Sequence, residues 1–447
     1  MSAKRRCVLF LQGSPSHFSR YFADELERRG ARALRINFAP GDWIFWHDKR
    51  VTNYRGTLQE WPAFLREFVV REDVTDIIYY ADRLPYHIAA GELALELGLQ
   101  AVAYEFGYLR PDWMTFERIG MSTHSRFPED PNHIRSAAKA LTRPNMTVEY
   151  PYTFRDEAMG EVLFHISNVL LKPFYPLYDR DKYYHPISEY LHYLPKLLSK
   201  RRRHARAKRL IRRLAQDKRS YFLFPLQLQS DRQIQFNSRF VHLSQAIEEA
   251  IDSFTKHASP QDLLIFKVHP LDNWIEPWNR IVRGLAASYG MSGRVKVLDG
   301  GLLGEMMEAS KGVVLVNSTA GISAIRMGVP VKVLGIAVFD IEGLACQKSL
   351  DEFWRSPTKP DLDLYADFEA LLAATIQIKG NVFTKEGRAA AARAAADKLL
   401  DNQVNLPNAL VEPPPRLARA KEHGIPVTLK EHLERRGRRN RWFHDPT

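Results

Sequence analysis

The sequence predicts an α/β fold built from two domains with a cleft between them. Short apolar runs alternate with helical patterns near the N-terminus and again after residue 220. This alternation indicates parallel sheets covered by helices. The chain has 447 residues, which is more than one hydrophobic core usually organises. Polar residues follow several predicted strands, and ligands of open α/β sheets bind at the carboxyl ends of strands.

The chain opens with a β-α-β unit of Rossmann type. Residues 7–11 are predicted to form a strand, residues 18–29 an amphipathic helix and residues 33–38 a second strand. The turn after the first strand begins with Gln12 and Gly13 and can bring backbone N–H groups close to a ligand. It lacks the G-x-G-x-x-G pattern, so it predicts no dinucleotide.

An aromatic loop and another strand follow. Residues 37–46 are predicted to form a loop in which aromatic rings surround Asp42. Rings beside a carboxylate suit a sugar or an acceptor, although aromatic loops more often simply pack. A strand over residues 75–80 then delivers Asp82 and His87 near its carboxyl end.

Glu105 follows the next predicted strand, residues 101–104, which comes after a helix over residues 88–97. A glutamate at the carboxyl end of a strand can act as a general acid or base if burial raises its pKa. The alternative is a structural ion pair with Arg110 or Arg83.

A polar loop follows a buried strand halfway along the chain. Residues 221–224 are an aromatic and aliphatic run too short for a helix, and Pro225 ends it. Residues 227–233 then supply many side-chain donors and acceptors around Asp231. This loop is a candidate site, and the alternative is a polar surface loop with an Asx turn at Asp231.

Strands and helices alternate regularly through the second half. The predicted helices cover residues 240–256, 274–289, 302–309 and 319–327, and the predicted strands cover residues 263–268, 295–298, 313–316 and 331–334. Residues that could bind a ligand follow two of these strands. They are Lys267 with His269, and the small-residue turn 317–321 at the start of a helix. A helix N-terminus with two hydroxyls is a ready anion site. Separately, Ser318 can be an N-cap and His269 a packed ring; together they favour a nucleotide phosphate.

Three stretches are less regular. Residues 112–195 are predicted to form short helices and a covering insertion. Residues 367–400 are Ala-rich and are predicted to be helical and to return to the N-terminal domain, whereas the tail from residue 413 is predicted to be extended or mobile. The predicted units are a Rossmann-type domain ending in a basic helical linker, a second Rossmann-type domain, and a helical segment with a basic tail, over residues 1–215, 216–360 and 361–447.

Positive charge is concentrated in residues 196–213 and 435–441, which carry much of the net charge of +12. Such runs attract the phosphates of nucleic acid or of anionic lipid, at about 1 kcal/mol per basic residue near an anionic membrane. The alternative is a solvated, highly charged helix. No recognised nucleic-acid module accompanies the runs, so we expect no nucleic-acid partner.

Cysteine content and hydropathy argue against a disulfide-rich protein, a cysteine metal site and a membrane-spanning helix. Cys7 and Cys346 are the only cysteines, too few for a disulfide framework or a cysteine metal site, which fits a reducing cytoplasm. No window approaches the roughly 20 apolar residues of a spanning helix, and no signal peptide is visible. No clustered histidine and cysteine site is present, so we expect no metal.

Several motifs occur in a fixed order between about residue 8 and residue 354. They are Gln12-Gly13, Gly41-Asp42, Asp82 with Pro85 and His87, EFGYLRP from Glu105, SDRQI from Ser230, HPLD from His269, NSTAGISA from Asn317, FDIEGL from Phe339, and Phe353-Trp354. Each motif alone is weak evidence for a family, but the whole set in this order is specific. It resembles the bacterial capsule polysaccharide synthesis and export proteins, in particular the single-module KpsS-type (LipB-like) β-Kdo glycosyltransferases.

The resemblance implies a GT-B-like fold, CMP-Kdo as donor substrate, and retention that gives a β-Kdo linkage. It implies that the first Kdo of the capsule linker is placed on a (lyso)phosphatidylglycerol at the cytoplasmic face of the inner membrane. The single set of motifs favours this role over extension of an existing Kdo-lipid. No cofactor is implied, and other capsule assembly proteins are further partners to consider.

The resemblance also assigns roles to residues. It implies Asp231 as nucleophile and Glu105 as acid/base, by the two-carboxylate logic of glycoside chemistry. Donor binding is expected of Gln233, Lys267, His269, Pro270, Asn317, Ser318, Thr319 and Gly321. The acceptor or sugar side is expected to involve Gln12, Gly13, Asp42, Asp82, His87 and Arg110. Membrane binding is expected of Arg201, Arg202 and Arg203.

The chain departs from the family's usual residues at four positions. Phe106 stands where the family usually has a second glutamate. Arg83 and Leu84 replace a cysteine and an arginine, and Arg232 replaces a serine. These changes bear on the acceptor. The alternative hypothesis is a non-catalytic partner in capsule assembly and export, with Phe106 a sign of lost activity.

Overall fold

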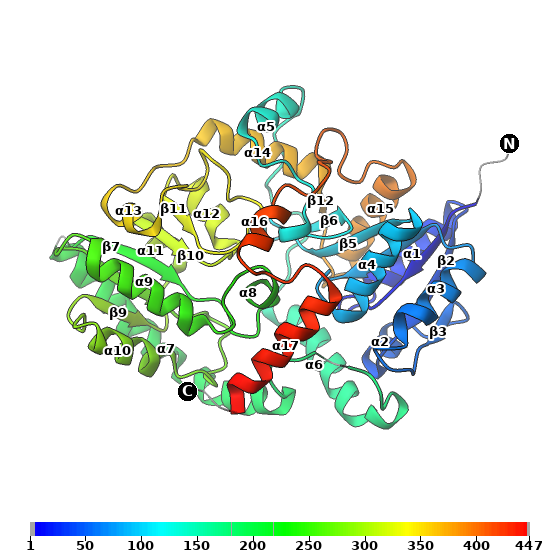
Figure 1. The fold of residues 1–447 in the computed structure, drawn as a ribbon, viewed down its shortest axis with the longest axis horizontal. Coiled ribbons are helices and arrows are strands. Elements are labelled where there is room, and N and C mark those ends of the chain that lie inside the picture. The colour runs from blue at the N-terminus through cyan, green and yellow to red at the C-terminus, as the bar shows by residue number, and fades with distance from the viewer. Residues whose placement is uncertain (1–4, 180, 218, 445–447) are drawn as a thin grey trace.

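The computed structural model describes residues 5–179, 181–217 and 219–444. Two helix-covered sheets lie next to each other in it, one of seven strands and one of five (Figure 1). The predicted α/β class with two Rossmann-type domains is confirmed. The C-terminal segment crosses the junction between the two sheets.

The N-terminal sheet has the strand order β12-β6-β5-β4-β1-β2-β3. Its strands are β1 (Cys7–Phe10), β2 (Arg32–Asn37), β3 (Val51–Asn53), β4 (Asp76–Tyr80), β5 (Gln100–Phe106), β6 (Trp113–Arg118) and β12 (Gln377–Lys379). The first five pair in parallel, whereas β6 and β12 add antiparallel. The central strand β1 is apolar throughout because helices bury both of its faces.

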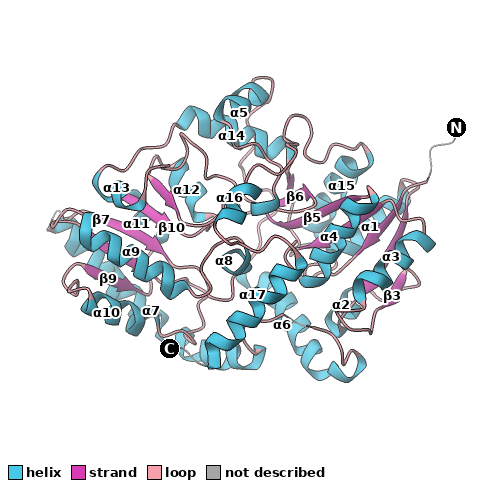
Figure 2. Cartoon of the chain, in the orientation of Figure 1, coloured by secondary structure: helices cyan, strands magenta, loops and turns pink. Residues whose placement is uncertain are grey.

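The helices of this domain cover both faces of the sheet (Figure 2). They are α1 (Phe18–Arg28), α2 (Pro40–Phe45), α3 (Trp61–Arg71), α4 (Pro85–Leu97) and α15 (Lys385–Leu400). The Ala-rich α15 packs closely against α1 because small side chains let the two helices approach. The aromatic stretch predicted as a loop contains the short helix α2.

The C-terminal sheet is entirely parallel, in the order β11-β10-β7-β8-β9. Its strands are β7 (Tyr221–Pro225), β8 (Leu263–Lys267), β9 (Val295–Leu298), β10 (Gly312–Leu315) and β11 (Val331–Val333). The intervening helices are α8 (Arg232–Phe236), α9 (Leu243–His257), α10 (Trp278–Ser288), α11 (Leu303–Glu308), α12 (Ala320–Arg326) and α13 (Leu350–Arg355). Most of the elements predicted here match within a few residues.

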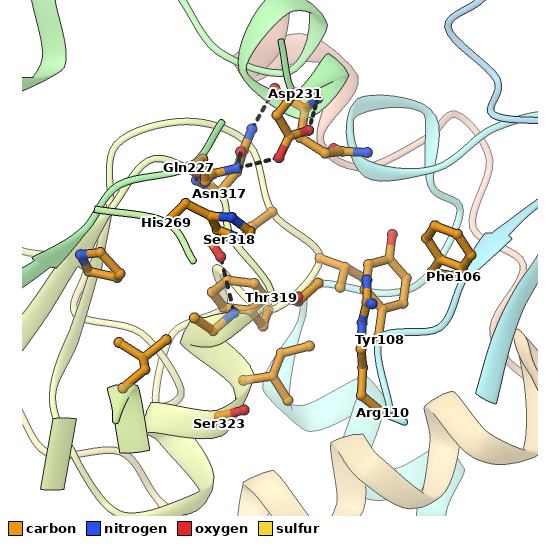
Figure 3. A pocket seen from close by; sticks show the side chains of 18 of the residues that line it. Phe106, Tyr108, Arg110, Gln227, Asp231, His269, Asn317, Ser318, Thr319 and Ser323 are labelled. Atoms are coloured by element: carbon orange, nitrogen blue, oxygen red, sulfur yellow. Dashed lines mark hydrogen bonds between the residues drawn. The ribbon is translucent and has the colours of Figure 1, made fainter. Parts of the chain in front are cut away.

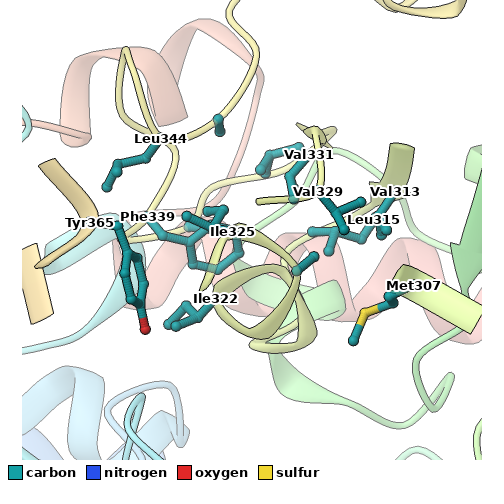
Figure 4. Close-up of a cluster of buried hydrophobic side chains, with 14 of the residues drawn as sticks. Met307, Val313, Leu315, Ile322, Ile325, Val329, Val331, Phe339, Leu344 and Tyr365 are labelled. Carbon is teal, nitrogen blue, oxygen red and sulfur yellow. The ribbon is translucent and has the colours of Figure 1, made fainter. Parts of the chain in front are cut away.

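The main core cluster under the C-terminal sheet combines aliphatic side chains of β10 and α12 with Tyr365 and Phe339 (Figure 4). Tyr365 belongs to α14 (Leu362–Thr375), which also packs on α5 (Pro131–Ala138) of the N-terminal half. The same cluster includes Leu109 from beyond β5. A continuous apolar layer therefore joins the two domains.

The middle of the chain is more regular than predicted. Besides β6 and α5 it contains the short helices η1 (Ser122–His124) and η2 (Lys172–Phe174), and two longer helices, α6 (Phe154–Leu170) and α7 (Pro186–Gln216). The strand β6 was not predicted, because its polar residues Thr115 and Glu117 are fully buried and it therefore lacks the apolar run of the other strands. The predicted basic helix is the C-terminal part of α7.

The C-terminal predictions need two corrections. Residues 367–400 do not form one helix, because β12 separates α14 from α15. The tail predicted to be extended or mobile forms α16 (Leu417–Glu422) and α17 (Leu429–His444). The side chains of residues 439–441, part of the predicted basic run, lie outside the described residues.

The C-terminal segment also joins the domains through buried polar contacts. Arg416 is fully buried, and its guanidinium donates to the carbonyls of Phe127 at 2.7 Å and Val338 at 2.8 Å. One carbonyl lies before α5 and the other after β11. In α17, His432 stacks on Phe236 of α8 with 4.2 Å between ring centroids.

Candidate functional site

A cleft of about 610 Å³ lies where the carboxyl ends of the two sheets face each other (Figure 3). Segments from both sheets line it. The N-terminal sheet contributes residues after β5, and the C-terminal sheet contributes the loops after β7, β8 and β10. Of the predicted site residues, these line it: Glu105, Arg110, Asp231, Gln233, Lys267, His269, Pro270, Asn317, Ser318 and Thr319.

Asp231 is held at the cleft by the turn that ends the β7 loop. It is the N-cap of α8, and its Oδ1 accepts from the backbone N–H of Gln233 at 2.8 Å. Its Oδ2 accepts from the side-chain amide of Gln227 at 3.1 Å. Burial raises the pKa of Asp231, and these two hydrogen bonds oppose that rise because they favour the charged form. The Asx turn considered from the sequence is present, and it points the carboxyl group into the cleft.

The Gln227 amide also ties this loop to the end of β10. It donates to Asn317 Oδ1 at 3.0 Å, and the Asn317 backbone N–H donates back to its Oε1 at 3.3 Å. The Asn317 side chain in turn donates to the carbonyl of Gln233 at 2.8 Å. Gln227 was predicted only as part of a polar loop. Its position beside Asp231 depends on a pairing between two separate loops, which the sequence does not reveal.

Glu105 faces Asp231 from the other domain. It is the penultimate residue of β5, and its side chain has no hydrogen-bond or ion-pair partner among the described residues. Burial and the nearby charges of Asp82 and Asp231 together raise the pKa of Glu105 to about 8. Glu105 is therefore protonated at neutral pH, as a general acid requires.

Phe106, the departure from the family pattern, is part of an aromatic stack. Its ring stacks on Phe383 with 5.4 Å between centroids, and the guanidinium of Arg110 lies 5.5 Å from its centroid. The positive charge of Arg110 partly opposes the rise in the pKa of Glu105. Phe106 thus supports the wall of the cleft next to the acid and holds a cation at its mouth.

Lys267 and His269 stand at the end of β8. Burial lowers the pKa of Lys267, and burial together with Lys196 and Lys267 lowers the pKa of His269 to about 4. At neutral pH the imidazole is therefore uncharged. The backbone N–H of Leu271 donates to its Nδ1 at 3.1 Å, so the proton is on Nε2, which is left as a donor.

Ser318 and Thr319 lie in the turn between β10 and α12 (Figure 3). Ser318 Oγ accepts from the backbone N–H of Ala320 at 3.3 Å and retains its own proton for a ligand. Gly321 is different, because it does not line the cleft. A Cβ at this position would collide with the ring of Phe339, so its role is close packing.

The residues predicted for the acceptor side, other than Arg110, lie in buried networks away from this cleft. Asp42 accepts from Arg35 at 3.2 Å and from Gln12 at 3.0 Å. A Cβ at Gly13 would crowd Ser19 and Tyr104. The three predicted residues of this region therefore have partners within the N-terminal domain and do not line the cleft.

Asp82 and His87 are also buried outside the cleft. Asp82 accepts from Arg83 at 3.2 Å and from the backbone N–H of Met121 at 3.1 Å. The His87 ring stacks on Tyr79 with 5.1 Å between centroids, and burial lowers its pKa to about 3. Asp82 still acts on the site, because its charge raises the pKa of Glu105.

The three arginines predicted to bind a membrane do not form one surface. Arg201 and Arg202 are exposed on α7. Arg203 forms an ion pair with Asp299 and lies over the ring of Trp274 at 5.5 Å, so it attaches α7 to the C-terminal sheet. None of the described helices combines the length and apolar character that a membrane span requires.

Known proteins resemble this chain over most of its length. The model of the family described as "Capsule polysaccharide biosynthesis protein" matches residues 75–383. The capsule polysaccharide export protein KpsS of Escherichia coli is 29% identical over 372 residues, covering 83% of this chain and 95% of that protein. The capsule polysaccharide modification protein LipB of Neisseria meningitidis serogroup B is 27% identical over 388 residues, which covers 85% of this chain and 92% of that protein.

Among solved structures, one similar chain is titled KpsC, β-Kdo 2,7 transferase, of Thermosulfurimonas dismutans. It has 13% identity and a TM-score of 0.43, with 89% of this chain and 99% of that chain covered. The family model spans well over half of the sequence and includes Glu105 and Asp231 of the cleft. The chain therefore belongs to the capsule polysaccharide biosynthesis protein family.

Proposed function

We propose that the protein is a retaining β-Kdo transferase that moves Kdo from CMP-Kdo to a (lyso)phosphatidylglycerol, which starts the poly-Kdo linker of capsular polysaccharide. The observation that carries this proposal is the pair Asp231 and Glu105, which face one cleft from opposite domains and differ in their hydrogen bonding. Membership of the capsule family and the printed names of the relatives support the choice of pathway.

In the first step Asp231 attacks C2 of Kdo. The bond between C2 and the CMP phosphate oxygen breaks, and its electron pair leaves with CMP. Glu105 is protonated near neutral pH and gives its proton to the departing phosphate. Gln227 holds the attacking carboxylate in place through its amide.

In the second step the acceptor hydroxyl attacks C2 from the face opposite Asp231. The ester bond to Asp231 breaks and its electrons return to the carboxylate. The hydroxyl proton passes to Glu105, which restores both residues to their starting states. Two inversions at C2 give net retention.

The phosphate of CMP is assigned to the C-terminal wall of the cleft, at the ends of β8 and β10. Lys267 supplies positive charge, His269 a neutral N–H donor and Ser318 a hydroxyl. Such fixed donors stabilise the charge that builds up on the phosphate as the sugar leaves. CMP is already a good leaving group, so the main contribution of the protein is positioning.

The test is transfer to a fluorescent lysophosphatidylglycerol by purified protein supplied with freshly generated CMP-Kdo. A new acid-labile Kdo-lipid is expected with the wild type and none with Asp231→Asn. Asp130→Asn is the matched control, because Asp130 caps α5 outside the cleft as Asp231 caps α8. Product only with a Kdo-lipid acceptor would assign the chain to linker extension. No product with any acceptor would favour the non-catalytic role, for which the replacement at Phe106 is the supporting observation.

A further inference from the structure

We propose that the outer face of α6, continued by η2, is a docking surface for an anionic lipid bilayer. Four apolar residues of α6 recur at intervals of four, three and four positions, which places them on one side of a helix. They are strongly exposed: Met159 at 65%, Leu163 at 44%, Ile166 at 46% and Leu170 at 71%. We call these four side chains the α6 ridge.

The ridge continues into the following segment. Leu171, Phe174 and Leu177 are 37%, 61% and 51% exposed. The other large exposed apolar side chains are spread over several elements of the described chain, as at Val70 and Leu362. Single exposed apolar residues are ordinary, whereas a concentration of seven between residues 159 and 177 indicates an interaction surface.

The opposite face of α6 is firmly packed, so the ridge is not a consequence of a loose helix. Phe164 fits against Gly41 so closely that a Cβ there would collide with its ring. The Asn168 Oδ1 accepts from the backbone N–H of Gly41 at 2.8 Å. Gly160 approaches the carbonyl of Pro15 just as closely. The N-terminal domain therefore presents the ridge in a fixed orientation.

The charges around the ridge select an anionic bilayer as the occupant. Arg155 and Lys172 are exposed at its two ends, and Lys182 is exposed beyond η2. Two acids of α6 are engaged by groups of the same segment: Asp156 accepts from the Thr153 backbone N–H at 2.7 Å, and Glu161 pairs with His165. Apolar side chains flanked by cations are the pattern of interfacial helices that lie on anionic membranes. A second copy docked antiparallel on α6 would place Arg155 against Lys172.

The ridge and the cleft share this helix. Glu157, near the start of α6, lines the cleft, whereas the ridge begins two residues later. A bilayer bound at the ridge therefore lies close to the cleft mouth. That this contact delivers a lipid acceptor rests on the proposed function; that the ridge binds a bilayer does not.

Vesicle flotation tests the docking. The probe is a set of vesicles of 70% phosphatidylcholine and 30% phosphatidylglycerol, with pure phosphatidylcholine as the neutral arm. Replacing the four ridge residues by glutamine is expected to lower the bound fraction at least tenfold. The matched control replaces four exposed apolar residues elsewhere, Val70, Leu95, Met327 and Leu362, by glutamine, and is expected to float like the wild type. Equal flotation of the ridge variant and the wild type would overturn the proposal.

A second measurement detects contact between the α6 ridge and the bilayer directly. Both natural cysteines are buried, so Leu163→Cys can be labelled selectively with an environment-sensitive fluorophore. A blue shift on adding the anionic vesicles is expected, and the same label at Leu362→Cys should not respond. No shift at position 163 would contradict docking. A concentration-dependent shift without vesicles, with a dimer in light scattering, would show that a second copy covers the ridge.

Transfer to a short-chain lysophosphatidylglycerol dispersed in detergent separates this proposal from the proposed function. The ridge variant should retain wild-type transfer in detergent and lose most of it on vesicles. Absence of transfer by the wild type in both media, with normal flotation, would refute the proposed function and leave the docking surface intact.

Discussion

Three acidic residues near strand ends, Asp42 in the N-terminal domain and Asp231 and Glu105 in the cleft, look alike in the sequence and differ in the structure: Asp42 is buried, whereas the other two are half-buried. The Asp42 carboxylate accepts four hydrogen bonds, from Arg35, from Gln12 and from the backbone N–H groups of Phe38 and Ala39. Asp231 has two donors, and Glu105 has none among the described residues. Unused hydrogen-bonding capacity distinguishes the candidate site from the structural network.

The largest expected effect is on transfer by Asp231→Asn. The amide cannot form the ester with Kdo, so we expect the rate to fall by about 10⁴-fold or more. Asparagine caps a helix as well as aspartate does, so the free energy of unfolding should change by less than about 1 kcal/mol. Transfer assays and urea unfolding measure the two quantities. Retained transfer would remove the nucleophile role.

Asp42→Asn should show the reverse pattern. The substitution leaves the buried guanidinium of Arg35 without its ion-pair partner, which costs about 3 to 5 kcal/mol in comparable cases. The folded fraction should transfer Kdo at the wild-type rate, because Asp42 does not line the cleft. A loss of rate in fully folded protein would mean that the Asp42 network takes part in the site.

Glu105→Gln is expected to lower transfer by about 10²- to 10⁴-fold, the usual range for a general acid. It should also stabilise the protein at pH 8. The folded pKa of Glu105 is raised to about 8, so between its unfolded pKa and pH 8 only the unfolded state loses the proton, and stability falls as pH rises. Removing this penalty should raise the free energy of unfolding at pH 8 by about 2 to 4 kcal/mol. Equal stabilities at pH 8 would contradict the raised pKa.

The pH dependence of the transfer rate tests the acid role of Glu105 independently. Glu105 must be protonated to assist the departure of CMP, so the rate should fall about tenfold per pH unit above roughly 8. The residual rate of Glu105→Gln should not show this fall. A wild-type rate that is constant up to pH 10 would exclude the acid role.

The smallest effect is expected for Gln227→Ala. Its amide positions Asp231 and ties that loop to Asn317, so we expect a fall of about tenfold in the rate, close to 1.4 kcal/mol. Gln347→Ala is the matched control, since Gln347 donates to Asp340 at 3.1 Å on the surface. An unchanged rate for Gln227→Ala would show that the N-cap bond alone positions Asp231.

The sequence predicted much of the fold because alternating apolar runs mark parallel strands, as in β7, β8 and β10. It missed β6, in which the polar residues Thr115 and Glu117 are buried among the apolar ones. It also missed α17, which is stabilised by distant contacts such as the stacking of His432 on Phe236 and the ion pair of Arg436 with Asp179 at 2.6 Å. Helices held by tertiary contacts carry little local signal.

The candidate site was predictable only in part. Strand ends and polar loops located Asp231, Glu105 and Lys267 correctly at the cleft. The same signals also selected Asp42 and His87, because spacing along a strand does not show whether other side chains already satisfy a polar group. That information comes from residues distant in sequence.

The position of β12 in the N-terminal sheet determines the order in which the molecule can be completed during synthesis. The ribosome releases all five strands of the C-terminal sheet, up to residue 333, before β12 and α15 of residues 377–400 exist. The N-terminal sheet is therefore completed after the C-terminal sheet. Until residues 377–400 have been released, β6 has an open edge and α1 lacks its partner helix, so a chaperone bound to the nascent chain would find its target at the N-terminal domain.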